Sequence, residues 1–346
     1  MNRLDEAKTI CNQLIARGHD DTFIHRDLLA LAALQNNEQA LEREYQWGEK
    51  HRGDTAMLYA EAQHAASLGK VKQSTTALEE IAKRTVARGD AEWAADTLII
   101  SAEINSEVGR QSQSVKQSTE ALKLGKNQIV LGLAALIEAR ARNKSQSREL
   151  LEELDHEYPL ATFNLAVYSP MNRTTQAVSQ GSSVEEVTTL MEPARRYESG
   201  SVADLLPTYV RGVSYLKVRS GSDAQREFQK ILDHHAVDDV TDLYPLAELG
   251  WARSYALQGR KDESRQAYQT FFMLWKDADP DLPILLEARR EFLDLQSRPR
   301  DTEPRATQRN PVIDGVSGIP ASSPDLAGLI ERSVGLVEVG ARFAGG

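Results

Sequence analysis

The sequence predicts an all-α fold built from repeated helical hairpins that stack into a solenoid. Its 346 residues are 41% hydrophobic and only 6% aromatic, and Gly and Pro are scarce before the last fifty residues. That composition favours helix over sheet. Small and aromatic residues also recur with a period of 33 to 40 residues, and periods of that length are typical of helical repeats.

The clearest repeat covers residues 206–232. Its small, aromatic, small and aromatic positions are Gly212, Tyr215, Ala224 and Phe228. The same positions 40 residues later are Ala252, Tyr255, Ser264 and Tyr268. Small residues let the two helices of a hairpin approach each other, and the aromatic pair fills the space between them. The pattern therefore indicates packing rather than chemistry.

Weaker copies of the repeat predict seven hairpin turns, at Asn36, Gly69, Gly109, Arg142, Ser182, Arg219 and Gly259. Helix periodicity breaks at each of these small or polar residues. We expect about seven hairpins, because that number also satisfies the stacking on which a solenoid depends. An N-terminal half-repeat over residues 2–17 precedes them, so the chain is expected to start in mid-repeat. A capping helix that ends at Leu295 follows them.

Two segments of different composition are expected. Residues 1–296 form the solenoid, and residues 297–346 form a disordered tail. The tail is rich in Pro, Arg, Ser and Gly and holds five of the twelve prolines, a composition that does not support a packed core.

Four strings in the repeats carry the densest match to a known family, at 206–212, 228–234, 244–247 and 271–281, and the last of them is the specific one. Through them, residues 21–295 resemble the tetratricopeptide (TPR) C-terminal region of bacterial serine/threonine protein kinases and of some winged-helix regulators. The resemblance implies a scaffolding or sensory arm whose kinase or DNA-binding domain lies N-terminal, sometimes across a transmembrane segment. That domain is missing from this chain, and the tail does not match the family.

We expect no catalytic site and no cofactor. The string His25-Arg26-Asp27-Leu28 spells the start of a kinase catalytic loop. The magnesium-binding Asn of such a loop would fall at Ala32, no Asp-Phe-Gly follows, and the stretch before His25 is too short to hold a nucleotide lobe. Phosphate-binding loops, Gly-x-Ser-x-Gly and His-Glu-x-x-His are also missing from the sequence. His25 therefore starts a repeat helix in our interpretation.

Other reactive side chains are expected to be structural, and no metal site is predicted. One group of polar residues has metal-binding chemistry but not metal-binding spacing: His234, His235, Asp238 and Asp239. Adjacent histidines on a helix point about 100° apart, so a solvated loop is favoured. Cys11, the single cysteine, lies on an apolar stripe and is expected to be buried. Four aromatic residues at helical spacing are expected in the core rather than in a binding patch: Trp251, Phe271, Phe272 and Trp275.

Charge and hydropathy narrow the class of partner. The net charge of −10 and the pI of about 5.3 disfavour nucleic acid. The N-terminus lacks the apolar stretch of a signal peptide and the longest apolar runs are too short to span a bilayer, so a cytoplasmic protein is expected. The remaining prediction is a non-catalytic scaffold that binds a protein or peptide of unknown identity. The alternative is the regulatory arm of a kinase or winged-helix regulator. The sequence leaves the oligomeric state open.

Three basic residues are predicted to line the binding groove: Arg140, Lys217 and Arg253. In a TPR stack the first helices of successive hairpins form the concave face, and these residues project there from three repeats. Spaced cations in an acidic protein would hold a carboxylate-bearing extended segment. The alternative is that they lie along the helix surface or pair with neighbouring acids.

Overall fold

The computed structural model describes residues 3–200, 203–234 and 240–297, and every regular element in these ranges is helical. The N-terminal helices are α1 (Leu4–Ala16), α2 (Thr22–Leu34), α3 (Glu38–Lys50), α4 (Thr55–Ser67), α5 (Val71–Ala87), α6 (Ala91–Glu107), α7 (Gln111–Leu124), α8 (Gln128–Arg140) and α9 (Lys144–Glu157). The remaining helices are a π-helical turn η1 (Asn164–Tyr168), α10 (Ser169–Val178), α11 (Val184–Met191), a 3₁₀ turn η2 (Glu192–Arg196), α12 (Leu206–Lys217), α13 (Gly221–Asp233), α14 (Leu243–Leu257), α15 (Lys261–Leu274) and α16 (Pro283–Ser297). The predicted all-α class is confirmed.

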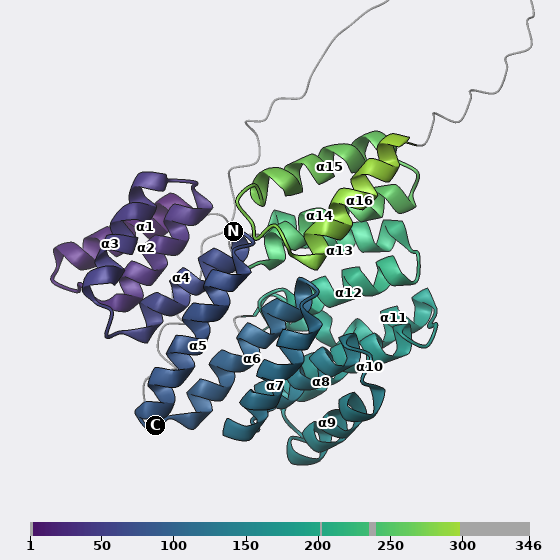
Figure 1. Cartoon of the computed structure of the whole chain (residues 1–346), viewed down its shortest axis with the longest axis horizontal. Helices are drawn as coiled ribbons and strands as arrows, with labels where there is room; N and C mark the ends of the chain where they lie inside the picture. Colours follow the sequence, from purple (N-terminus) through teal and green to yellow (C-terminus); the bar gives the residue numbers. More distant parts are fainter. Residues whose placement is uncertain (1–2, 201–202, 235–239, 298–346) are drawn as a thin grey trace, which may run out of the picture.

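The helices pair into successive hairpins, from α2 with α3 to α14 with α15, and the hairpins stack into a curved array (Figure 1). Each hairpin turns through a residue with positive φ: Asn36, Gly69, Gly109, Arg142, Gly181, Arg219 and Gly259. In six of them the next residue donates its N–H to the carbonyl five positions back, as Lys70 does to Ala65 at 2.9 Å. This bond satisfies a helix-end carbonyl in a left-handed C-terminal cap. Six turns fall on the predicted residue, and the seventh is at Gly181 rather than Ser182.

The small residues of the repeat bring paired helices into contact. In three hairpins a serine of the second helix donates its hydroxyl to a backbone carbonyl of the first helix. These bonds are Ser114 to Ala102 at 2.6 Å, Ser147 to Ala135 at 2.9 Å and Ser264 to Ala252 at 2.9 Å. Phe228 fills the equivalent space farther along, where its ring is fully buried between Gly212 and Gly250.

The middle of the array is packed on all sides rather than hollow. Nearly every residue of α6 from Ala94 to Ser106 and of α8 from Val130 to Ala139 is buried. Both helices are therefore covered by protein on nearly all faces, which is the position of an interior helix. One continuous core joins residues of α4, α5 and α6 with residues of α12 to α16. A separate small core, formed by Cys11, Ile24, Leu28 and Leu31, holds α1 and α2 together.

The array curls until its C-terminal end meets its second and third hairpins. The loop before α16 contacts the α4–α5 and α6–α7 turns, and we call this contact the seam. Across the seam, the N–H of Asp279 donates to the carbonyl of Gly69 at 3.0 Å. The N–H of Ile284, in the first turn of α16, donates to the carbonyl of Val108 at 3.2 Å. The indole N–H of Trp275 donates to the carbonyl of Ser67 at 3.1 Å. In Figure 1 the loop before α16 runs beside the upper end of α5.

The division of the chain into a solenoid over 1–296 and a tail over 297–346 stays a prediction. Residues 298–346 lie outside the described ranges. The helix α16, which runs to Ser297, reaches the expected boundary.

Candidate functional site

Arg140 ends α8 and is held by two acidic residues of α6. Its guanidinium lies 3.6 Å from Glu103 and 2.5 Å from Glu107. Its side chain is only 13% exposed. Burial, together with the nearby Glu107 and Asp242 carboxylates, raises the pKa of Glu103 well above its ordinary value, although Arg140 opposes the effect. Arg140 is therefore paired inside the chain, most closely with Glu107.

Arg253 on α14 is paired in the same way with the next inner helix. Its Nε lies 3.0 Å from Glu291 and its Nη2 lies 3.1 Å from Glu287, both on α16. The Tyr268 hydroxyl donates to the same Glu291 carboxylate at 2.9 Å. Arg253 therefore fastens the capping helix to the last hairpin.

Lys217 differs from the two arginines. It is exposed at the end of α12, and among the described residues its ammonium has no ion pair or hydrogen bond. Desolvation by the surrounding protein and the nearby Arg140 and Arg142 charges lower the pKa of Lys217, while Glu107 acts in the opposite direction. The structure thus brings Lys217 close to Arg140. For Arg140 and Arg253 it shows the alternative, pairing with neighbouring acids, and their role in binding a partner stays a prediction.

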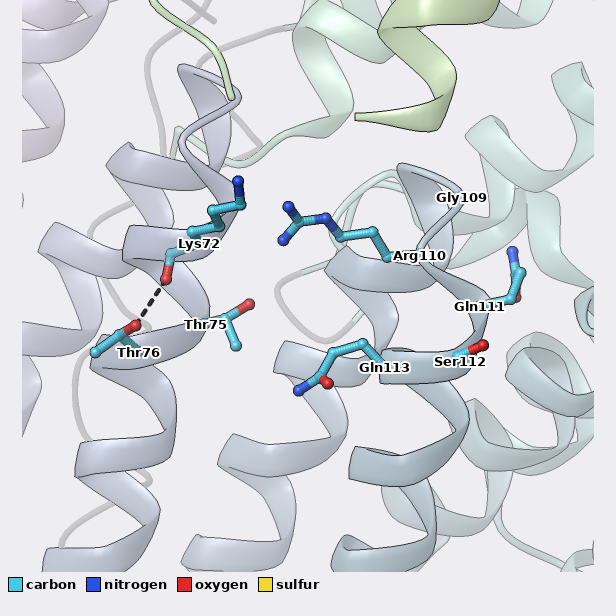
Figure 2. Close-up of a pocket in the computed structure, with 8 residues that line it drawn as sticks. All are labelled: Lys72, Thr75, Thr76, Gly109, Arg110, Gln111, Ser112 and Gln113. Carbon is cyan, nitrogen blue, oxygen red and sulfur yellow. Dashed lines mark hydrogen bonds between the residues drawn. The ribbon is translucent and has the colours of Figure 1, made fainter. Parts of the chain in front are cut away.

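A polar cleft opens between the first turns of α5 and α7 (Figure 2). Its volume is about 550 Å³. The residues that line it are Lys72, Thr75, Thr76, Gly109, Arg110, Gln111, Ser112 and Gln113. Lys72 and Arg110 point toward each other across the gap in Figure 2. The cleft therefore presents two cations surrounded by neutral hydroxyls and amides.

A carboxylate of the seam reaches both cations of the cleft. Asp281 accepts a hydrogen bond from Lys72 Nζ at 2.8 Å, and its oxygens lie 3.4 and 3.5 Å from Arg110 Nη2. The hydrogen bond from Lys72 lowers the pKa of Asp281, so the carboxylate is ionised. The seam therefore combines backbone hydrogen bonds with an ion-paired carboxylate.

Asp279 supplies a helix cap from the far end of the chain. Lys70, the residue before α5, makes no capping bond with its own side chain. The Asp279 carboxylate accepts the backbone N–H of Lys72 at 2.8 Å instead. A carboxylate at a helix N-terminus satisfies a free donor and complements the helix dipole. Local pattern does not predict a contact between residues so far apart in the chain, so the role of the 271–281 string in this cap was not foreseen.

The residues of the kinase-like string are occupied by structural contacts. His25 is buried, and its two ring nitrogens lie 2.6 Å from Glu44 and 2.6 Å from Asp20. Asp27 is exposed and pairs with Arg26 at 3.1 Å. His25 therefore joins α2 to α3, in agreement with its interpretation as part of a repeat helix.

The other singled-out side chains lie largely in the core. Cys11 is buried, and this burial raises the pKa of its thiol. Phe271 and Trp275 are buried with ring centroids 4.9 Å apart, while Trp251 and Phe272 are partly buried against the same core. His234 bonds to the carbonyl of its own helix at Lys230, and His235, Asp238 and Asp239 lie outside the described residues. The described ranges contain no group of three His, Cys, Asp or Glu side chains placed to hold a metal ion, and none of their helices has the length and apolarity of a membrane span.

Comparison with known proteins gives little. No protein-family model matches the chain, and no curated protein matches it. Among solved structures, the crystal structure of the P58(IPK) TPR domain matches with 13% sequence identity, over 85% of this chain and 99% of that one, with a TM-score of 0.24. A TM-score this low does not establish a shared arrangement, so the helical-repeat description rests on the hairpins themselves.

Proposed function

We propose that this chain is a non-catalytic protein-interaction scaffold of the TPR type. The observation that carries the proposal is the array of stacked hairpins with one repeated turn geometry. The small and aromatic positions described above, such as Ser264 and Phe228, are used for packing between helices, which leaves the exposed turns and helix faces available for contacts. Such surfaces commonly bind other proteins, and their specificity lies in a few variable side chains.

The scaffold is inferred to lack phosphoryl-transfer activity. Of the kinase-like string, His25 is buried between two carboxylates and Asp27 is exposed beside Arg26, so the two do not face each other in a cleft. The test is incubation of the purified chain with radiolabelled ATP and generic protein substrates. Label that is incorporated, and that is lost in Asp27→Ala, would contradict the proposal.

Lys217, Arg253 and Arg140 remain the proposed contacts for an acidic partner segment. Lys217 is accessible to a partner, whereas Arg140 and Arg253 would have to break their ion pairs within the chain before they could pair with acidic residues of the partner. The double variant Lys217→Ala with Arg253→Ala should weaken the binding of a captured partner by about 1–3 kcal/mol, and the loss should be larger at low salt than at high salt. Lys144→Ala, at the exposed start of α9, is the control and should leave the affinity unchanged. Equal affinities of the double variant and the control would move the binding surface elsewhere.

The more specific alternative is a regulatory arm of a serine/threonine kinase or a winged-helix regulator. It is supported by the resemblance of residues 271–281, which in this chain build the seam. Genomic sequence directly upstream of Met1 tests it. An in-frame domain carrying Asp-Phe-Gly would favour the kinase arm, and an in-frame stop codon would contradict it.

A further inference from the structure

Arg110 is a mostly buried cation that lacks a close anion. Its side chain is only 17% exposed, and Asp281 is its described ion-pair partner, at 3.4 Å. A well-made hydrogen bond between a guanidinium and a carboxylate has a nitrogen–oxygen distance of about 2.7–2.9 Å, and arginine favours two such bonds at once. The Arg110 site is therefore built for a carboxylate that approaches more closely than Asp281 does.

A partner carboxylate could replace Asp281 at Lys72 and Arg110. The Asp281 side chain is 56% exposed, and that of its other partner Lys72 is 57% exposed. Ion pairs this accessible to water contribute little to stability and are screened by salt. The seam is also held by hydrogen bonds of Trp275, Asp279 and Ile284 that do not involve Asp281. Losing the Asp281 contact would therefore free the cations without unfolding the array.

The cleft beside these cations has room for a short extended segment. It is an open surface hollow of about 550 Å³, which suits a segment that lies along the surface. Hydroxyl and amide groups of Thr75, Ser112 and Gln113 line it and suit a peptide backbone. One turn farther along α5 from Thr75, Glu79 accepts hydrogen bonds from Gln113 at 3.4 Å and Gln117 at 2.9 Å. A carboxylate this near to the cleft disfavours a polyanion and favours a single carboxylate at Lys72 and Arg110.

We propose that the cleft between α5 and α7 binds an extended acidic segment of a partner protein, and that Asp281 is a built-in competitor that occupies the two cations until the partner displaces it. The inference rests on the proposed scaffold function and assigns one surface to it. The partner is recognised by an Asp or Glu carboxylate between Lys72 and Arg110, with its backbone along the polar walls.

The probe for the test is a fluorescein-labelled peptide with the sequence of residues 276–283, Lys-Asp-Ala-Asp-Pro-Asp-Leu-Pro, titrated with the full chain and followed by anisotropy at low salt. An exposed ion pair is formed in about half to five-sixths of molecules, so removing the competitor in Asp281→Asn should tighten probe binding by about two- to sixfold. Asp262→Asn, which removes an exposed acid of α15, controls for net charge and should bind like wild type.

Two further variants remove the cations. Arg110→Gln, combined with Asp281→Asn, should lower affinity at least tenfold, and Lys72→Gln in the same background should lower it several-fold. Lys72 is exposed, so this second variant keeps the test valid if Arg110→Gln loses its helical signal.

The proposal is overturned if Asp281→Asn binds the probe no more tightly than wild type, or if Asp262→Asn tightens it equally. It is also overturned if Lys72→Gln binds as well as its Asp281→Asn parent, or if a probe with Asn in place of its last Asp binds as well as the original. A partner that binds the chain with the same affinity in wild type, Asp281→Asn and Lys72→Gln would contradict the cleft but leave the scaffold function intact.

Discussion

Gly250→Ala is the most direct test of how consecutive hairpins pack. A Cβ added at Gly250 would lie 2.4, 2.5 and 2.6 Å from the Cζ, Cε1 and Cε2 atoms of Phe228. Real Cβ atoms do not approach other atoms this closely, so the ring or the helix must move. Space toward α12 is also tight, because a Cβ at Gly212 would lie 2.8 Å from the same ring.

Two opposing effects set the size of the change. Alanine is the better helix former by up to about 1 kcal/mol, whereas overpacking of a rigid core costs about 1–3 kcal/mol. The upper part of that range applies because three ring atoms are affected at once. The free energy of unfolding should therefore fall by about 2 kcal/mol, which corresponds to a thermal midpoint about 3–5 °C lower for a chain of this size.

The assay is thermal unfolding followed by circular dichroism, with Gly53→Ala as the matched control. A Cβ at Gly53 meets no atom within 4 Å, so this variant should unfold like wild type. Phe228→Leu removes the ring atoms that clash, so Gly250→Ala should cost at least about 1 kcal/mol less in that background. Wild-type stability of Gly250→Ala, or equal costs in the two backgrounds, would refute the close contact between α13 and α14.

Three further predictions concern charges and the tail. Burial raises the pKa of Glu248 from 4.5 to about 7. Between these two pH values the folded chain keeps the Glu248 proton, whereas the unfolded chain has lost it. The free energy of unfolding therefore falls as the pH rises through this window. Glu248→Gln should therefore raise stability by about 1–3 kcal/mol at pH 8 and leave it unchanged at pH 4, in denaturant titrations that use the exposed Glu152→Gln as control. Arg211→Met should cost about 3–5 kcal/mol in the same titrations, because the fully buried Arg211 pairs with both Glu198 and Glu227 and its loss leaves Lys230 as the close cation for two carboxylates; a second change, Glu227→Gln, should recover part of that cost. Deleting residues 298–346 should shift the thermal midpoint by no more than about two degrees, and a drop of about ten degrees would show that the tail packs on the solenoid.

Local pattern was sufficient to predict the hairpins. The small and aromatic positions, such as Gly212 and Phe228, lie in the contacts that the repeat spacing indicates, and the turn residues fall where helix periodicity breaks. Both features depend on residues near in sequence, so periodicity records them directly. The π-helical turn at Asn164–Tyr168 was not foreseen, because the short sequence that forms it has the same apolar character as an ordinary helix.

The acidic residues that pair with Arg140 and Arg253 lie at a regular distance from them in the sequence. Arg140 pairs with Glu107, about one repeat earlier in the chain, and Arg253 pairs with Glu287, about one repeat later. The two residues of each pair lie on different helices, α6 and α8 for Arg140 and α14 and α16 for Arg253. Opposite charges one repeat apart therefore predict ion pairs between hairpins. The alternative expected for Arg140 and Arg253, that they pair with neighbouring acids, is the one that this spacing supports.

The seam could not be predicted because it depends on how small rotations add up along the array. In an open solenoid each hairpin contacts only its neighbours, and stability is a sum of local terms. Here the carbonyl of Gly69 accepts a hydrogen bond from Asp279, and one core joins α4–α6 with α12–α16. The second hairpin therefore cannot separate from the fold without exposing the last one, whereas α1 and α2 share a small core outside this closure. A contact between two distant parts of the chain thus turns a repeat array into one cooperative unit, and it places Asp281 over the two cations of the α5–α7 cleft.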